Sequence, residues 1–260
     1  MIVSIHQPNF LPYCGIIEKI YLSDKFVFLD NVQYSKNSYH NRNYIMGSAG
    51  KQLIGVPVHA RLQDKINDVN ICNGFKLSKL YTTLECNYNR SKCFHLYKER
   101  FKKIFNTEYI RLVDLNISLL KYILEILNIH TELILVSEID GVRSNLKGTE
   151  RLVEICSKLS STIYLSGRGG KEYLNVDRFK KDNIEVIFQN YRACKYNQFN
   201  NDKDFVANLS VADLIFNEGS NALNILVNSS KDEIYYNKLI KYRKKYPPYH
   251  IREDILENFN

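Results

Sequence analysis

Long apolar stretches are missing from this chain, because no segment reaches the run of about 18 apolar residues that a membrane-spanning helix needs. The N-terminus also lacks a charged segment followed by an apolar core and a small-residue cleavage site, so we expect no secretory signal. Both absences favour a cytoplasmic protein without a membrane span. Tryptophan is absent too, but the hydrophobic content of 45% is ordinary for a globular protein of 260 residues with a sizeable core.

Paired cysteines are also missing. The six cysteines form no C-x-x-C pair, and no group of cysteine and histidine has the spacing of zinc ligands. We therefore expect free thiols in a reducing compartment and no bound metal.

Acidic residues are in the minority, with 28 Asp and Glu against 36 Lys and Arg, which gives a net charge of +8 and a pI near 9.0. Such a balance suits a protein that binds nucleic acid or an anionic membrane, a protein with solvated lysines, or a basic pocket for phosphate-bearing small molecules. The lysines are spread along the chain, and no arrayed basic and aromatic motif is present. We expect scattered surface charge and no nucleic-acid partner.

The first 45 residues predict a βαβ unit with polar loops. Residues 2–5 form a short apolar strand, residues 6–12 a loop with two prolines, residues 15–20 the start of a helix, and residues 26–30 a second strand. The polar segment 34–43 follows. Open α/β sheets bind ligands at the carboxyl ends of their strands, so we expect a site where these two loops begin.

The remaining chain alternates between helical and strand patterns. Apolar residues at three- and four-residue steps predict a helical insert over 76–128. Strands are expected at 131–137, 162–165 and 184–188, with helices at 148–159, where Thr149 is the expected N-cap, and from about residue 176. We predict an α/β fold with a mostly parallel open sheet and flanking helices. The expected parts are 1–75 and 129–220 for the α/β domain, 76–128 for the insert, and 221–260 for a C-terminal helix and polar tail, with a break at Pro247–Pro248.

Two polar loops supply the first candidate site residues. His6 follows a strand and is suited to proton transfer near neutral pH, and Gln7 and Asn9 lie beside it in a loop that prolines stiffen. Asp30 ends the second strand, where it could orient a histidine or accept a sugar hydroxyl. The amides of Asn41 and Asn43 flank the guanidinium of Arg42, which suits a phosphate or a carboxylate.

A glycine-rich turn and one carboxylate complete the candidates. The segment 166–173 has the sequence Ser-Gly-Arg-Gly-Gly-Lys-Glu-Tyr, which can offer backbone N–H groups to an anion together with the charges of Arg168 and Lys171. Its spacing fits neither a Walker A loop nor the G-x-G-x-x-G fingerprint. Asp213 lies in the first turn of a helix that Ser210 can cap, and we predict that it reaches the site.

These segments together resemble the signatures of the WbqC-like family. The N-terminal matches are Ile5-His-Gln-Pro-Asn-Phe-Leu-Pro12, Gly15, Phe28-Leu-Asp-Asn-Val-Gln-Tyr-Ser35 and Asn41-Arg-Asn43. The C-terminal matches are Leu165-Ser-Gly167, Lys171-Glu-Tyr-Leu174, Tyr196-Asn-Gln198, Leu209-Ser210 and Asp213-Leu-Ile-Phe-Asn217. They occur in the family's order over residues 1 to about 220, whereas the middle helical region matches only in character.

The resemblance implies an enzyme of bacterial O-antigen or other surface-polysaccharide biosynthesis. Its expected substrate is a nucleotide-activated amino sugar, and its expected reaction is the transfer of an acyl or aminoacyl group to the sugar amine. On the family pattern, the site is lined by His6, Asn9, Asp30, Asn41, Arg42 and Asn43. We assign catalysis to His6 as general base and to Asp30, and substrate binding to Gln7, Asn9, Asn41, Arg42, Asn43, Ser166, Gly167, Arg168, Lys171, Tyr173 and Asp213.

Other functions stay open from the sequence. The opening βαβ unit also resembles that of nucleotidylyltransferases and pantothenate-synthetase-like ligases, which would use ATP and Mg²⁺. Those enzymes carry an H-x-G-H motif before the helix, where this chain has Tyr13-Cys-Gly15. A third hypothesis is a non-catalytic assembly factor that binds a sugar nucleotide.

Overall fold

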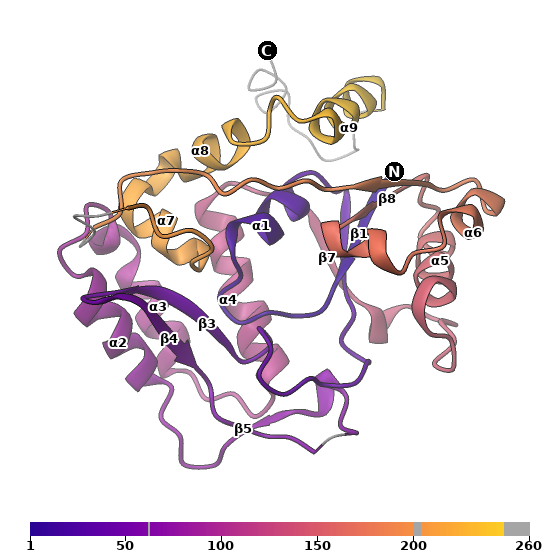
Figure 1. Ribbon diagram of the computed structural model, residues 1–260. Coiled ribbons are helices and arrows are strands. Elements are labelled where there is room, and N and C mark those ends of the chain that lie inside the picture. The colour runs from indigo at the N-terminus through magenta and orange to yellow at the C-terminus, as the bar shows by residue number, and fades with distance from the viewer. Residues whose placement is uncertain (62, 200–203, 247–260) are drawn as a thin grey trace.

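A five-stranded parallel sheet forms the centre of the computed structural model, which describes residues 1–61, 63–199 and 204–246 (Figure 1). The strand order is β7-β2-β1-β8-β9, and every neighbouring pair is parallel. The strands are β1 (Ile2–His6), β2 (Lys25–Phe28), β7 (Glu132–Leu135), β8 (Ile163–Ser166) and β9 (Glu185–Phe188). The predicted α/β class with a parallel open sheet is therefore confirmed.

The chain winds this sheet in two directions from its central strand. From β1 it moves outward through β2 to β7, and it then crosses to the other side of β1 to form β8 and β9. The order therefore reverses between β1 and β8. In doubly wound sheets, ligands bind in the crevice at such a switch point, outside the carboxyl ends of the strands.

Helices cover both faces of the sheet, as the alternating side chains of β1 require. Val3 and Ile5 pack against apolar residues of α5 (Gly148–Lys158) and α6 (Val176–Lys181). Ile2, on the opposite face, packs with α9 (Ile234–Lys245). On that same side α1 (Cys14–Tyr21) joins the largest core cluster.

The predicted helical insert consists of α2 (Ser78–Tyr88), α3 (Phe94–Asn106) and α4 (Leu112–Ile126). Figure 1 shows these helices on one side of the sheet, with α5 and α6 on the other. Leu112, Leu115 and Leu119 of α4 are buried in the largest core cluster, as their spacing predicts. The division of the chain at residues 75, 128 and 220 stays a prediction.

The polar segment around residues 40–43 differs from its prediction as a loop. Arg42 and Asn43 belong to β3 (Arg42–Gly47), which pairs antiparallel with β4 (Gly50–Gly55) outside the central sheet. The turn is formed by residues 48–49, and Gly50 directly after it has a φ of 105°, which suits glycine. Ile45 of β3 and Ile54 of β4 are buried. A second short ladder joins β5 (Val58–His59) to β6 (Asn70–Ile71).

One predicted helix cap is confirmed and one is wrong. Ser210 Oγ accepts a hydrogen bond from the Ala212 amide at the start of α7 (Val211–Glu218), as predicted. Thr149 is not the N-cap of α5, because that position belongs to Lys147. The Thr149 hydroxyl instead accepts a hydrogen bond from the Asn175 amide, which ties α5 to the start of α6.

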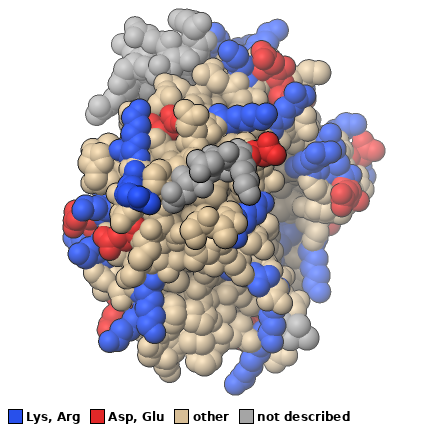
Figure 2. Space-filling model, turned by 60° about the vertical axis from the view of Figure 1, so that its left-hand side comes forward, with Lys and Arg blue, Asp and Glu red and all other residues tan. Residues whose placement is uncertain are grey.

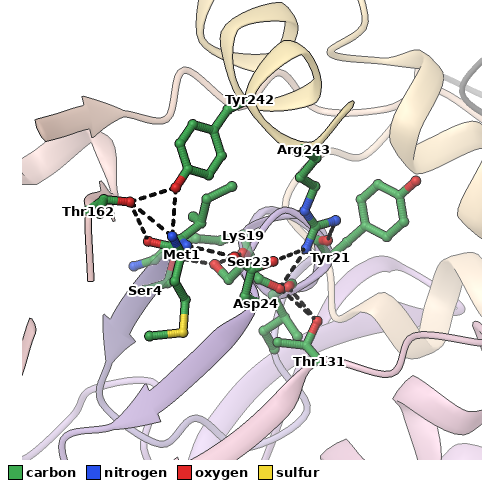
Figure 3. Close-up of polar contacts among 12 residues, drawn as sticks. Met1, Ser4, Lys19, Tyr21, Ser23, Asp24, Thr131, Thr162, Tyr242 and Arg243 are labelled. Atoms are coloured by element: carbon green, nitrogen blue, oxygen red, sulfur yellow. Dashed lines mark hydrogen bonds and ion pairs between the residues drawn. The ribbon is translucent and has the colours of Figure 1, made fainter. Parts of the chain in front are cut away.

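The C-terminal helices close the amino edge of the sheet. The chain continues through α8 (Ala222–Asn228) into α9. In Figure 3, the N-terminal ammonium and Thr162 bond the Tyr242 hydroxyl, and Arg243 reaches the Ser23 carbonyl and Asp24. Met1, Asp24 and Thr162 each directly precede a strand, so this polar cluster lies opposite the carboxyl edge. The polar tail and the break expected at Pro247–Pro248 lie outside the described residues.

Candidate functional site

The candidate site lies at the carboxyl edge of the sheet, between β1 and β8. His6 is the last residue of β1 and Ser166 is the last residue of β8, and the two strands are paired. The loop 7–13 therefore leaves the sheet next to the glycine-rich turn 167–173. The fold thus brings together two segments that the sequence separates by about 160 residues, at the position where doubly wound sheets bind ligands.

His6 is half-buried and held by its own loop. Its Nδ1 lies 2.9 Å from the Gln7 carbonyl oxygen. Burial, together with the nearby charge of Lys19, lowers the pKa of His6 to about 4. The imidazole is therefore neutral at physiological pH, in the form that can accept a proton.

A second histidine, His40, lies beside this loop and was not assigned a role from the sequence. Its ring is buried, its Nδ1 lies 2.9 Å from the Pro8 carbonyl oxygen, and it is close enough to His6 to lower the pKa of His6. Burial also lowers the pKa of His40. The only feature of the sequence that could have assigned His40 to the site was its place next to Asn41, because no local pattern indicates that residues 40 and 8 are in contact.

Neighbouring segments hold the His6 loop in shape. The side-chain amide of Asn43 donates a hydrogen bond to the Leu11 carbonyl at 2.6 Å, and Leu11 has a φ of 42°. The Phe10 amide donates to the Tyr39 carbonyl at 2.9 Å. Asn41 bridges the Tyr34 hydroxyl and the Val56 carbonyl. These bonds give Asn41 and Asn43 a structural part in the site, while their predicted substrate contacts stay predictions.

Lys19 is a second residue that sequence reasoning missed. It lies on α1 beneath the sheet, its Nζ donates to the Ile5 carbonyl at 3.0 Å, and only 3% of the residue is exposed. Burial lowers its pKa to about 7. The sequence feature that could have identified Lys19 is a lysine on an otherwise apolar face of the predicted helix.

Asp30 is buried and bonded away from His6. Its carboxylate accepts hydrogen bonds from the Ser137 hydroxyl at 2.6 Å and the Ser137 amide at 3.1 Å. Asn67 donates to it at 3.4 Å. Asp30 thus joins the end of β2 to the turn after β7, and its catalytic role stays a prediction.

The glycine-rich turn forms a short 3₁₀ helix, Arg168–Glu172. A Cβ on Gly170 would lie 2.1 Å from Ser166 Oγ, whereas Gly167 and Gly169 have open space around them. Arg168 and Tyr173 are exposed, and the Lys171 ammonium lies 5.8 Å from the centre of the Phe188 ring. The turn therefore places two cations next to the switch point.

Two predicted site residues have their principal contacts elsewhere. Arg42 donates to the Asn37 side chain and carbonyl, so its guanidinium braces an exposed loop. Asp213 is fully buried and accepts hydrogen bonds from the hydroxyls of Tyr88 and Tyr196, each at 2.6 Å. Burial raises the pKa of Asp213. The structure gives neither residue a contact with His6.

A separate hollow of about 610 Å³ lies between the segments 70–78 and 105–110, and no predicted site residue lines it. Within the described parts of the chain, no group of three or more His, Cys, Asp and Glu side chains is arranged to hold a metal ion. No described helix is long and apolar enough to cross a membrane. On the face in Figure 2, Lys and Arg are scattered among Asp and Glu rather than gathered in one patch.

The fold and site define a doubly wound parallel α/β protein with a histidine loop and a glycine-rich turn at its switch point. The WbqC-like protein family model matches residues 7–225, and the chain belongs to this family. It is 32% identical over 228 residues to "Uncharacterized protein Rv1507c" of Mycobacterium tuberculosis (strain ATCC 25618 / H37Rv), a match that covers 86% of this chain and 96% of that protein. No solved structure matches. The family suggests a role in polysaccharide biosynthesis.

Proposed function

We propose that this protein transfers an acyl or aminoacyl group to the amine of a nucleotide-activated sugar in bacterial surface-polysaccharide biosynthesis. One observation carries the proposal: a neutral histidine and a basic glycine-rich turn lie side by side at the switch point of a doubly wound sheet. Family membership supports the pathway.

The nucleotide is expected at the glycine-rich turn. Gly167 and Gly169 leave open space in which phosphate oxygens can approach the backbone. The side chains of Arg168 and Lys171 add positive charge there, and Tyr173 is exposed at the end of the turn. The sugar then extends towards β1.

His6 is expected to act as the general base. As the sugar amine attacks the activated carboxyl carbon, a C–N bond forms, the amine proton moves to His6 Nε2, and the bond from carbon to the leaving group breaks. The resulting imidazolium returns its proton to the leaving group. Proton transfer of this kind contributes typically about 10²–10⁴-fold to the rate.

ATP-dependent nucleotidyl transfer or amide ligation is the second candidate, because His40 supplies the second histidine that the sequence lacks next to His6. Release of pyrophosphate from ATP in the presence of an amino sugar distinguishes it from direct acyl transfer. A binding protein without catalysis would show affinity and no turnover with any donor.

The first experiment is a thermal-stability screen with nucleotide-linked amino sugars, ATP and acyl-coenzyme A. A ligand present at a hundred times its dissociation constant adds about 2.7 kcal/mol to stability. A shift with one nucleotide-linked amino sugar supports the proposal. A shift with ATP alone would favour the second candidate function. The absence of a shift with every nucleotide sugar would contradict the proposed substrate.

The substitution His6→Ala tests the catalytic role. We expect turnover to fall by about 10²-fold or more while the thermal shift with the nucleotide sugar is kept. Because the pKa of His6 is about 4, protonation of His6 itself should lower the wild-type rate only as the pH approaches that value from above. The control is His95→Ala, at an exposed histidine on α3, which should leave the rate unchanged. Full activity in His6→Ala would rule out this base.

A further inference from the structure

Two buried acceptor atoms beside His6 have no hydrogen-bond partner among the described residues. They are Asn9 Oδ1 and His40 Nε2. Buried polar atoms are nearly always paired, so each unpaired one needs an explanation. The Asn9 side chain lies within hydrogen-bonding reach of the His6 ring and raises the pKa of His6, whereas the charge of His40 lowers it. The two unpaired acceptors therefore adjoin the proposed base.

The hydrogen bonds of the two rings fix which nitrogen carries the proton. Gln7 O and Pro8 O are carbonyl oxygens and can only accept, so Nδ1 is the donor in both His6 and His40. In a neutral imidazole, Nε2 is then an acceptor. The cluster of His6, Asn9 and His40 thus presents hydrogen-bond acceptors, and a ligand that binds there should carry hydrogen-bond donors.

The charges around the cluster favour an uncharged donor. Lys19 is the largest charged influence on His6, and no carboxylate contributes to the pKa shift of either histidine. A cationic ammonium would meet positive potential from Lys19 without a compensating anion. A neutral primary amine offers two N–H groups to these acceptors without that repulsion, and it is also the form of an amine that attacks a carboxyl carbon.

We propose that His6, Asn9 and His40 form the subsite for the uncharged primary amine of the acceptor sugar, with one amine N–H directed at His6 Nε2 and the other shared between Asn9 Oδ1 and His40 Nε2. This assignment rests on the proposed function and extends it to the group that is recognised. His6 and Asn9 are half-buried, so the amine approaches from their side, and His40 closes the inner end. Hydrogen bonds of this kind often tighten only when substrate binds.

Two substitutions at residue 40 separate the two nitrogens of its ring. In His40→Asn, the amide N–H₂ can replace Nδ1 as the donor to Pro8 O, while the Nε2 acceptor is removed. In His40→Gln, the longer amide can place its oxygen near the Nε2 position, while the donor to Pro8 is lost. If the acceptor matters, His40→Asn should lose amine recognition by 10-fold or more, on the order of 1.4 kcal/mol, and His40→Gln should keep part of it.

The experiment is nitrogen-15 NMR of the histidine rings in the full chain, with His6→Ala and His40→Asn used to assign the signals. The free protein should show both rings protonated at Nδ1. D-glucosamine is then added without a nucleotide, with D-glucose and N-acetyl-D-glucosamine as controls, and UDP-glucosamine is tested separately. We expect glucosamine alone to shift the Nε2 signals of His6 and His40 in the wild type, and His40→Asn to lose the response at His6.

The outcomes distinguish this inference from the proposed function. If glucosamine shifts Nε2 but no nucleotide-linked amino sugar binds or turns over, the amine subsite stands and the proposed function fails. Protonation at Nε2, or an equal response to glucose, overturns the amine subsite even if nucleotide sugars bind. No response of either ring to glucosamine or to UDP-glucosamine also overturns it.

Discussion

Lys19 is an unusual residue for the buried face of a helix that packs on a parallel sheet. Its ammonium donates a hydrogen bond to the Ile5 carbonyl. Its charge lowers the pKa of His6, the residue that follows Ile5. Burial of a cation without a carboxylate partner destabilises its charged form, which explains the lowered pKa. Burial of the His6 ring is the main reason that His6 is neutral, and the charge of Lys19 adds to this effect while Lys19 is protonated.

The lowered pKa of Lys19 predicts how stability depends on pH. Between its folded pKa of about 7 and its ordinary value of 10.5, the unfolded chain holds a proton that the folded chain does not. The free energy of unfolding should therefore rise with pH in this window, by up to about 1.4 kcal/mol per pH unit from this group. Below pH 7, both states are protonated and the full penalty of burial applies.

The variant Lys19→Met should lack this contribution. Chemical denaturation from about pH 7 to about pH 9 should show a shallower rise than in the wild type, with the variant relatively most stable at the acidic end. Lys121→Met, at an exposed position of α4, is the control and should follow the wild-type slope. Identical slopes in Lys19→Met and the wild type would contradict the lowered pKa.

At the scale of elements, the glycine-rich turn depends on one close approach. Gly170 is buried, and a Cβ there would meet Ser166 Oγ at 2.1 Å and Leu174 Cδ1 at 2.9 Å. The turn can therefore fold back onto the end of β8 only without a side chain at this position. Gly169, one residue earlier, is exposed with no atom within 4 Å of a Cβ.

These two glycines form a matched pair of tests. Gly170→Ala should destabilise the protein by about 1–3 kcal/mol, because Ser166 and Leu174 must move. Gly169→Ala should change stability by no more than about 0.5 kcal/mol. Urea denaturation measures both. Equal effects of the two substitutions would show that the close packing at Gly170 is unimportant.

At the scale of the whole molecule, α9 joins the C-terminal region to the first strands. Arg243 is buried and donates to the carbonyls of Tyr21 and Ser23, and it pairs with Asp24 at 3.3 Å. These contacts span more than 200 residues of sequence. They fix the starts of the strands at the amino edge of the sheet. The candidate site at the carboxyl edge therefore belongs to strands that are anchored at their other ends.

Removal of this anchor should therefore lower global stability. Arg243→Ala removes the guanidinium from the Tyr21 and Ser23 carbonyls and from Asp24, whose buried carboxylate keeps the Ile2 amide as a donor but loses its cation. We expect a loss of about 3 kcal/mol in the free energy of unfolding. Lys241→Ala, at an exposed position on the same helix, should change stability by less than about 0.5 kcal/mol. A small effect of Arg243→Ala would show that this polar anchor contributes little to the stability of the fold.

Local pattern determined most of the elements. Apolar runs predicted β1, β2, β8 and β9, and three- to four-residue periodicity predicted the helices of the insert, since each element must bury one face. His6 and the turn 167–173 could be singled out because each directly follows a predicted strand, where open α/β sheets bind ligands. The hairpin of β3 and β4 was missed at Arg42 and Asn43, because polar residues next to Arg and Asn resemble a loop until their antiparallel partner is known.

Only the tertiary structure decided which of these elements meet. The sequence does not state the order of parallel strands, so the switch point between β1 and β8 emerges from packing of the whole sheet. Asp30 bonds Ser137, Asp213 bonds Tyr88, and His40 bonds Pro8, each across at least 32 residues. The sequence determines the chemical groups of each side chain. The partners of those groups depend on long-range packing, because segments far apart in the chain come together to bury apolar surface and their buried polar groups must then pair with each other.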